Sequence, residues 1–413
     1  MNNILNRLNK NKSGKFVATD FILNLIASAV TTGIAQLLIY PYLAKIYDPQ
    51  EYGIILTIMG VGNTVINTLG NSLNNVRLMV NSNYEREGKK GDFLILAYSM
   101  GAIGFIAMLI YLLTFGQSFG IALILLSMFA TIGILRSYGV VSYRLELNFK
   151  KNLICSIFIA LGNIVGIVII HTTGIKSLWP LIFVFGELFG IGVVMFTSKI
   201  FREPFVKTQL FRFTSRKVII LLITTLITSL LTYLDRLILL PLLGGEAVSV
   251  YSTAAFFGKC LSVVMTPMAA VLLGYYAQND FIMTRKKFWV INATISIISL
   301  LFWLISLLLS KRITGLFYPT LIKDASPYLL IANLTSIIGT LGTMTQPAVL
   351  KYAPTYLQLV IQVGYCAIYL GGGLIGSNID GLMGFSVAAL IATVCRVIAL
   401  YLIGHIALKS VVK

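Results

Sequence analysis

The sequence predicts an all-α polytopic membrane protein, with about twelve transmembrane helices in two six-helix bundles related by a pseudo-twofold axis along the membrane normal. Three observations predict this class: long apolar stretches, basic residues that collect in every second gap between them, and a repeat offset by 200 residues. Composition agrees, because 57% hydrophobic and 11% charged residues leave too little polar surface for a soluble protein of 413 residues.

Each apolar stretch is long enough to cross about 30 Å of hydrocarbon, which needs roughly 20 helical residues. The gap at 310–327 is the least clear boundary. The basic leader and the first apolar run are expected to form an uncleaved first helix rather than a signal peptide. The twelve expected spans are 17–44, 51–76, 93–115, 118–142, 152–171, 178–198, 218–243, 247–275, 288–309, 328–349, 355–377 and 382–406.

The basic residues set the expected orientation. Of 32 Lys and Arg, 24 lie in seven regions that alternate with regions holding five, and the other three lie inside apolar stretches. Basic loops face the cytoplasm in helical membrane proteins, so both termini are expected there. The net charge of +18 is therefore attributed to membrane topology, and no nucleic-acid partner is expected.

Shifting the chain by 200 residues aligns the first expected helix with the seventh. We therefore expect two lobes, 1–200 and 201–413, as parallel repeats with the substrate path between them. The alternative is a chance agreement between two apolar helices. The aligned pairs are Asn24 with Thr224, Ser28 with Thr228, Thr32 with Thr232, Gln36 with Arg236 and Pro41 with Pro241, and, after one deletion, Tyr52 with Tyr251, Gly60 with Lys259 and Asn63 with Ser262.

Polar residues recur every four positions on these helices, so they form stripes along single faces. A polar stripe is costly against lipid, and it is expected to line either a hydrated cavity or a hydrogen-bonded helix contact. We favour the cavity. The uncharged candidates for substrate binding are Asn24, Gln36, Asn63 and Asn67. Pro41 and Pro241 predict bends in the first and seventh helices, either static or part of a motion.

Charged residues inside apolar stretches are the other candidates, because ionisable groups are rare in membranes unless they are functional or paired. Cations would suit an anionic substrate, with Lys259 first and Arg396 second. Glu187 is the leading candidate for coupling to protons or sodium ions, and pairing with a buried cation is its structural alternative. The substrate candidates are Lys259, Arg396 and Arg236, together with Arg136, which would line the cytoplasmic mouth of the cavity, and the ion-coupling candidates are Glu187, Asp235 and Asp20.

Two turns resemble those of a known family. Tyr42–Gly53 contains Leu-Ala-Lys and then Pro-Gln-Glu-Tyr-Gly, which resembles the turn after the first helix of bacterial polysaccharide-export flippases. Asp235-Arg236, followed by Leu243–Ala255, resembles the matching turn of their second half. These are the Wzx-type oligosaccharide flippases of the multidrug/oligosaccharidyl-lipid/polysaccharide superfamily. The related lipid II flippases carry cavity arginines in their first two helices, whereas this chain has only Arg77 there, so that site is not transferred.

The resemblance implies a transporter in the bacterial cytoplasmic membrane. It would move an undecaprenyl-pyrophosphate-linked oligosaccharide from the inner to the outer leaflet, by alternating access, for capsule or O-antigen type polysaccharide. The implied partners are this lipid-linked substrate, the lipid bilayer and other polysaccharide-assembly membrane proteins. No catalytic residue, metal or cofactor is expected, and proton or sodium coupling is left open.

Two other functions are retained as alternatives. A membrane-embedded glycan polymerase would need positioned acids, a base, a metal or a large loop, and His171 and His405 have no nearby ligand set in the sequence. A drug/cation antiporter of the same superfamily would share the architecture. Cation export favours acidic cavity residues, whereas cations predominate at the central positions here.

Overall fold

The computed structural model describes residues 14–88, 91–114, 120–277 and 283–410. The side chains of 14–21, including that of the candidate Asp20, lie outside the described part. Helices contain nearly all the described residues, and none of those residues lies in a β-strand. Eleven of the described helices are long and apolar enough to cross a membrane. The structure therefore confirms the all-α class and the approximate number of helices.

The first six expected spans are all helical. Short irregular stretches divide the first two, and a short helix follows the fourth. Their elements are α2 (Gly14–Ile34), η1 (Ala35–Ile39) and α3 (Tyr40–Ile46); α4 (Pro49–Ile66), η2 (Asn67–Asn71) and α5 (Ser72–Arg86); α6 (Phe93–Thr114); α7 (Ile121–Gly139) and α8 (Val141–Leu145); α9 (Phe149–Thr173); and η3 (Lys176–Leu178) with α10 (Leu181–Thr197).

The last six spans follow a short turn, η4 (Ile200–Arg202). Two of their helical elements, α12 and α17, each contain a break between two expected spans. The elements are α11 (Phe211–Thr232), α12 (Leu234–Ala254), α13 (Phe256–Ala277), α14 (Arg285–Phe317), α15 (Ile322–Ala325), η5 (Ser326–Tyr328), α16 (Leu329–Tyr352) and α17 (Thr355–Ser410).

The backbone at these breaks shows why the helices and the expected spans do not correspond one to one. Gly244 in α12 has φ 82° and Gly381 in α17 has φ 51°, conformations that favour glycine and interrupt a helix. A Cβ added at Gly376 would overlap the backbone carbonyl of Gly384, eight residues further on. Residues so separated lie about 12 Å apart along a continuous helix. The chain therefore turns back inside α17, which supplies both the eleventh and the twelfth spans.

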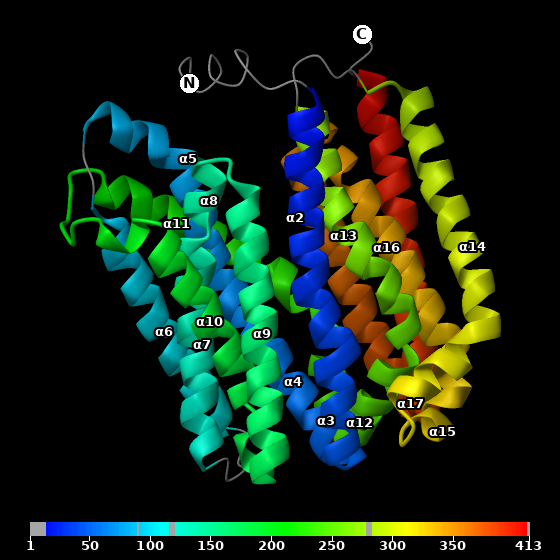
Figure 1. Cartoon of the computed structure of the whole chain (residues 1–413). Coiled ribbons are helices and arrows are strands. Elements are labelled where there is room, and N and C mark those ends of the chain that lie inside the picture. Colours follow the sequence, from blue (N-terminus) through cyan, green and yellow to red (C-terminus); the bar gives the residue numbers. More distant parts are fainter. Residues whose placement is uncertain (1–13, 89–90, 115–119, 278–282, 411–413) are drawn as a thin grey trace. The chain divides into compact units, whose positions relative to one another are not determined.

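The chain forms two compact units. The first unit contains the described part of Met1–Ile34 with Ile58–Tyr233, and the second contains Ala35–Thr57 with Leu234–Lys413. Within the first, α9 packs on α10 and α2, and α7 on α6 and α10; within the second, α16 packs on α13, α14 and α17 (Figure 1). The predicted lobes 1–200 and 201–413 rest on the sequence repeat, whereas the two units are defined by which segments pack together. The units therefore do not test the lobes, which stay a prediction.

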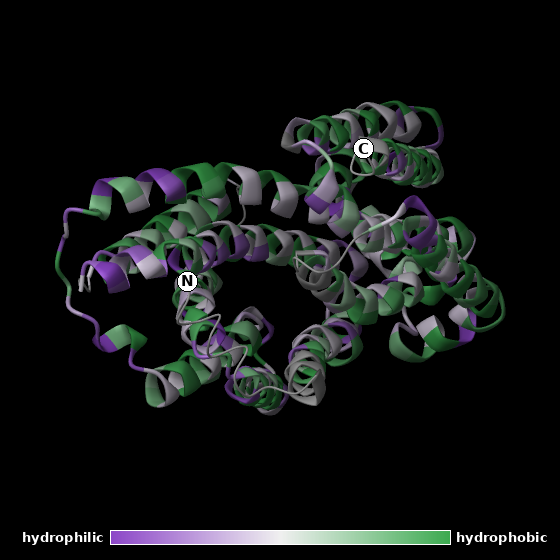
Figure 2. Cartoon of the chain, turned by 90° about the horizontal axis from the view of Figure 1, so that it is seen from above, coloured by the Kyte–Doolittle hydropathy of each residue, from purple (hydrophilic) through white to green (hydrophobic). Residues whose placement is uncertain are grey.

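Apolar residues predominate along most helices, and hydrophilic residues gather in short segments (Figure 2). Large apolar side chains remain uncovered by protein, for example Leu308 (78% exposed) and Ile379 (79% exposed). Extensive apolar exposure of this kind is unfavourable in water and suits contact with lipid. The fold thus agrees with the membrane class predicted from composition.

Helix irregularities recur at positions that the sequence repeat aligns. The π-helical turn η1 begins at Ala35, and the seventh span breaks at Tyr233, two residues from the position aligned with Ala35. Likewise η2 contains Thr68, and the repeat aligns Thr68 with Pro267 in α13. Proline removes a helical hydrogen bond, and a π-turn widens the helix, so both disturb the same turn. Pro41 is the second residue of α3, which begins where η1 ends, and the bend expected in the first helix stays a prediction for this position.

Two helices differ in length from the prediction. The second span continues to Arg86 rather than ending near 76, because Val80 and Tyr84 are buried on one face and keep that turn packed. The ninth runs from Arg285 to Phe317, so the first part of the uncertain gap at 310–327 continues this helix. After a turn, the short α15 and η5 lie in the last part of that gap before α16 begins.

Candidate functional site

An ion pair lies at the start of α12 in the second unit. Asp235 occupies the first turn of that helix, directly after the break at Tyr233, and one of its oxygens accepts the backbone N–H of Arg236 at 2.9 Å. Its other oxygen lies 3.6 Å from the Nζ of Lys259 in α13. The two side chains are 14% and 25% exposed, so the pair is largely shielded. The structure thus brings together two candidates that the sequence placed separately.

Arg236 is buried beside this pair. Its Nη1 donates to the backbone carbonyl of Leu56 at 2.9 Å, and its guanidinium carbon lies 5.8 Å from the ring centroid of Tyr40. Only 6% of the residue is exposed. A buried guanidinium is stabilised by hydrogen bonds to carbonyls and by aromatic faces. Arg236 therefore joins the segment 35–57 to α12 within the second unit.

A second arginine of this unit lies in the last half of α17. The Nη2 of Arg396 donates to Gln346 Oε1 in α16 at 3.0 Å, and its guanidinium carbon lies 5.1 Å from the ring centroid of Tyr365. The side chain is partly buried. Sequence reasoning found Arg396 but neither of these two partners, because only the packing of α16 on α17 defines them.

Aromatic rings connect these charged groups. Tyr251 and Tyr369 both pack edge-on against Phe385, with centroids 5.3 and 5.8 Å away, and Tyr365 lies 5.6 Å from Tyr369. Asp235 interacts electrostatically with the hydroxyl groups of Tyr251, Tyr365 and Tyr369. The second unit therefore contains a connected polar and aromatic region. Tyrosines present both apolar faces and hydroxyl groups, which suits recognition of a mixed polar ligand.

Outside the spans of this unit, Tyr318 follows the end of α14. Its ring centroid lies 6.5 Å from that of Tyr52 and 5.1 Å from that of Phe256. Burial raises the pKa of the Tyr318 hydroxyl above its ordinary value of 10.0. Tyr318 is therefore a neutral packing residue at physiological pH.

The first unit contains a second ion pair, between Arg136 in α7 and Glu187 in α10. The pair is bidentate: Nε donates to Oε2, and Nη2 donates to Oε1 at 3.0 Å. A glycine makes room for it, since a Cβ added at Gly190 would lie 2.5 Å from Arg136 Cδ. The expected structural alternative for Glu187, pairing with a buried cation, is the arrangement seen. Gly190, three residues after Glu187, was the signal that sequence reasoning missed.

Asparagines of the second span form a hydrogen-bonded chain at η2. Asn71 donates to Asn67 Oδ1 at 3.0 Å and accepts from Ser137 Oγ at 2.6 Å. Asn74 donates to the carbonyl of Ser137 at 2.7 Å and accepts from Arg144 at 2.8 Å. The π-turn lies at these residues, and π-turns are frequent at functional sites. The predicted candidate Asn67 thus belongs to a network joining α5, α7 and α8.

The remaining uncharged candidates are dispersed. Asn24 accepts a hydrogen bond from Asn152 in α9 at 2.9 Å. Gln36 lies within η1 in the second unit and is partly exposed, and Asn63 is partly exposed in α4 of the first. The candidates therefore divide between the two units, and each unit contributes its own polar group.

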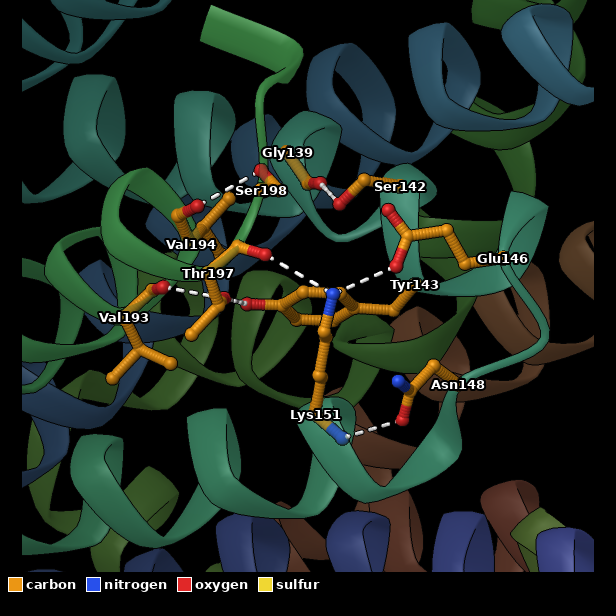
Figure 3. Close-up of polar contacts among 10 residues, drawn as sticks. All are labelled: Gly139, Ser142, Tyr143, Glu146, Asn148, Lys151, Val193, Val194, Thr197 and Ser198. Carbon is orange, nitrogen blue, oxygen red and sulfur yellow. Dashed lines mark hydrogen bonds and ion pairs between the residues drawn. The ribbon is translucent and has the colours of Figure 1, made fainter.

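Two polar clusters that sequence reasoning did not identify lie at the end of the first unit predicted to be cytoplasmic. Arg77 forms a bidentate pair with Glu203 at 2.6 and 3.1 Å, which ties the segment after α10 to α5. In Figure 3, Lys151 reaches both Glu146 at 2.7 Å and the carbonyl of Thr197 at 3.1 Å. The Arg77–Glu203 and Lys151–Thr197 contacts join residues far apart in sequence, so no local pattern predicts them.

Comparison with solved structures identifies the fold. The chain resembles a MATE transporter in the bent conformation (TM-score 0.66, 16% identity, 95% of each chain) and an inward-facing multidrug resistance MATE family transporter of the MOP superfamily (0.65, 14%, 95% of each). It also resembles the Vibrio cholerae MATE transporter VcmN in the bent form (0.63, 14%, 96% of this chain and 98% of that one). No protein-family model and no curated protein sequence matches the chain.

These likenesses extend over nearly the whole chain, so the protein has the fold of the MATE transporters. At 14–17% identity they establish the architecture alone. The charged and polar groups described above are properties of this chain.

Proposed function

We propose that this protein is a membrane transporter that works by alternating access. Two things support the proposal. Solved structures with the same fold include transporters described as inward-facing and as outward-facing. In addition, charged and aromatic side chains gather within the predicted spans of each unit, where a polar path through hydrocarbon would need them.

The substrate proposed here is an anionic, lipid-linked oligosaccharide, moved from the inner to the outer leaflet. The proposal rests mainly on the charge of the second unit's polar region. Among the residues described there, three cations, Lys259, Arg236 and Arg396, accompany one carboxylate, Asp235. An excess of positive charge at low dielectric favours an anionic ligand such as a pyrophosphate. The tyrosine faces nearby suit sugar rings, and the resemblance of Tyr42–Gly53 to flippase turns supports the same substrate class.

A second candidate, drug or cation antiport, is favoured by the structural neighbours, which are described as multidrug transporters. A cation carrier needs a carboxylate that is free to exchange its partner. Glu187 is held by Arg136 in a bidentate pair, while the Asp235–Lys259 distance of 3.6 Å is a looser contact. Asp235 is therefore the carboxylate on which the antiport candidate depends.

Depletion of the protein in its native cell distinguishes the two candidates. We expect complete repeat units to accumulate on undecaprenyl pyrophosphate in the inner leaflet and surface polymer to disappear. Lipid-linked glycans are measured by mass spectrometry after extraction, and surface polysaccharide is measured on the same cells. Re-expression of the wild-type chain should restore export, whereas Lys259→Ala should restore it only weakly.

Other outcomes identify the rivals. Unchanged glycans together with increased retention of cationic dyes would overturn the flippase proposal in favour of antiport. Single repeat units that reach the outer leaflet but stay unpolymerised would instead indicate a polymerase.

A further inference from the structure

Arg396 occupies the middle of its helical segment. The last half of α17 runs from Gly381, where the chain reverses, to Ser410. Arg396 is therefore about 22 Å from one end and about 21 Å from the other, at 1.5 Å per residue. An arginine side chain cannot span either distance, so this guanidinium cannot reach an interface by extending along the helix.

The contacts of Arg396 leave most of its donors unused. A guanidinium has five N–H donors, and the bond to Gln346 uses one of them. The Nε is shielded from solvent and has no hydrogen-bond partner in the described structure. No carboxylate among the described residues lies within ion-pair distance of Arg396. Opposite the guanidinium, α16 presents Gly342, where an added Cβ would lie 4.0 Å from Arg396 Cζ.

Arg396 differs from three other shielded cations of the described chain, which pair with carboxylates, and from Arg236, which donates to a backbone carbonyl. Arg77 pairs with Glu203, Arg136 with Glu187, and Lys259 with Asp235. A buried cation without a counter-ion is costly, and the cost is removed when an anion binds. Gln346 and the ring of Tyr365 hold the guanidinium in one orientation, which reduces the ordering needed at binding.

We propose that Arg396, oriented by Gln346 and Tyr365, binds a phosphoryl group within the second unit. Guanidinium groups match phosphate oxygens in a two-pronged geometry, and such charge-assisted bonds are stronger than neutral ones. The proposal deepens the proposed function and rests on it where it assigns that phosphoryl group to the transported lipid. The same chemistry would also accept a phospholipid headgroup or a free phosphate.

The test measures binding to the purified full-length chain in detergent. Farnesyl pyrophosphate serves as the probe and farnesol as its uncharged counterpart, with the shift in unfolding temperature and calorimetric titration as readouts. We expect the pyrophosphate to stabilise the wild type and farnesol to have little effect. Arg396→Gln should weaken binding about tenfold or more, and Arg396→Lys should retain part of it because the charge remains.

Matched controls separate binding from folding. Arg312→Gln removes an exposed arginine of α14 by the same substitution and should bind the probe like the wild type. Each variant must elute as a single species on size exclusion, and Tyr365→Leu provides a second test if Arg396→Gln does not fold. Equal affinity of Arg396→Gln and wild type for farnesyl pyrophosphate would overturn the proposal.

Competition identifies the source of the phosphoryl group. Displacement of the probe by inorganic pyrophosphate alone would indicate a soluble anion, and displacement by phosphatidylglycerol would indicate a membrane lipid; both support the phosphoryl site. If Arg396-dependent binding is found while cellular glycan export is unaffected by depletion, the site stands and the assigned substrate is wrong. If export depends on the protein but no probe depends on Arg396, this inference fails and the proposed function stands.

Discussion

Arg236 donates a hydrogen bond to the backbone carbonyl of Leu56 at 2.9 Å, although 180 residues separate them. Around this bond, Thr320 donates to the carbonyl of Ala44 at 3.3 Å, and the backbone N–H of Glu246 donates to Gln50 at 2.9 Å. These bonds incorporate the segment 35–57 into the second unit. Helices one and two are thus each divided between the two compact units.

The Arg236 bond gives the first prediction. Arg236→Gln should lower the free energy of unfolding by about 2 kcal/mol, because it removes a charged hydrogen bond and leaves a buried carbonyl with one partner fewer. Thermal unfolding of the detergent-purified protein measures the loss. Arg312→Gln is the control and should change stability little, since that side chain is exposed. Equal stability of the two variants would contradict a structural role for Arg236.

The Arg136–Glu187 ion pair gives the second prediction. Glu187→Gln or Arg136→Gln alone should destabilise the protein by about 3 kcal/mol, because each leaves an unpaired buried charge. The double variant should be more stable than the sum of the single effects predicts, since neither charge is then left alone. Chemical unfolding of the four proteins completes this cycle.

That cycle also tests the role predicted for Glu187 from the sequence. A coupling carboxylate would give a stable Glu187→Gln variant that has lost ion-dependent transport. Strictly additive destabilisation, with no coupling between the two sites, would show that the ion pair does not hold α7 to α10.

The close approach of Gly53 and Gly245 gives the third prediction. A Cβ at Gly53 would overlap the backbone carbonyl of Gly245, and backbone cannot yield as a flexible side chain can. Gly53→Ala should therefore cost about 1–3 kcal/mol of stability. Gly371→Ala is the matched control in α17, where an added Cβ meets nothing within 4 Å, and alanine should be neutral or slightly stabilising there. A tolerated Gly53→Ala would mean that the two segments are further apart than described.

The predicted membrane topology gives the fourth prediction. Glu246 is exposed beside the break in α12, and the charge pattern places it outside, whereas the exposed Lys199 is placed in the cytoplasm. With the four native cysteines replaced, Glu246→Cys should react with an impermeant maleimide on intact cells, and Lys199→Cys should react only after permeabilisation. Mass-shift labelling on gels reads out both. The reverse pattern would invert the predicted topology.

Much of the fold could be predicted because local composition decides it. The apolar length of each span and the basic residues between spans do not depend on which helices pack together. The aligned residues Pro41 and Pro241 likewise marked helices that the structure shows to be irregular nearby, at η1 and at Gly244. Individual candidates such as Lys259, Asp235 and Glu187 could be found because charges are costly in hydrocarbon wherever they point.

The partners of those charges could not be predicted. Arg136 meets Glu187 across 51 residues, and Arg77 meets Glu203 across 126, because particular faces of two helices are in contact. The sequence by itself determined the membrane class, the helices and their repeat, since the hydrocarbon core imposes length and polarity on each span separately. Only the tertiary structure decided which charges are neutralised by a carboxylate and that Arg396 instead contacts Gln346 and Tyr365. It also decided how helices one, two and seven divide between the units, because all of these depend on contacts between distant segments.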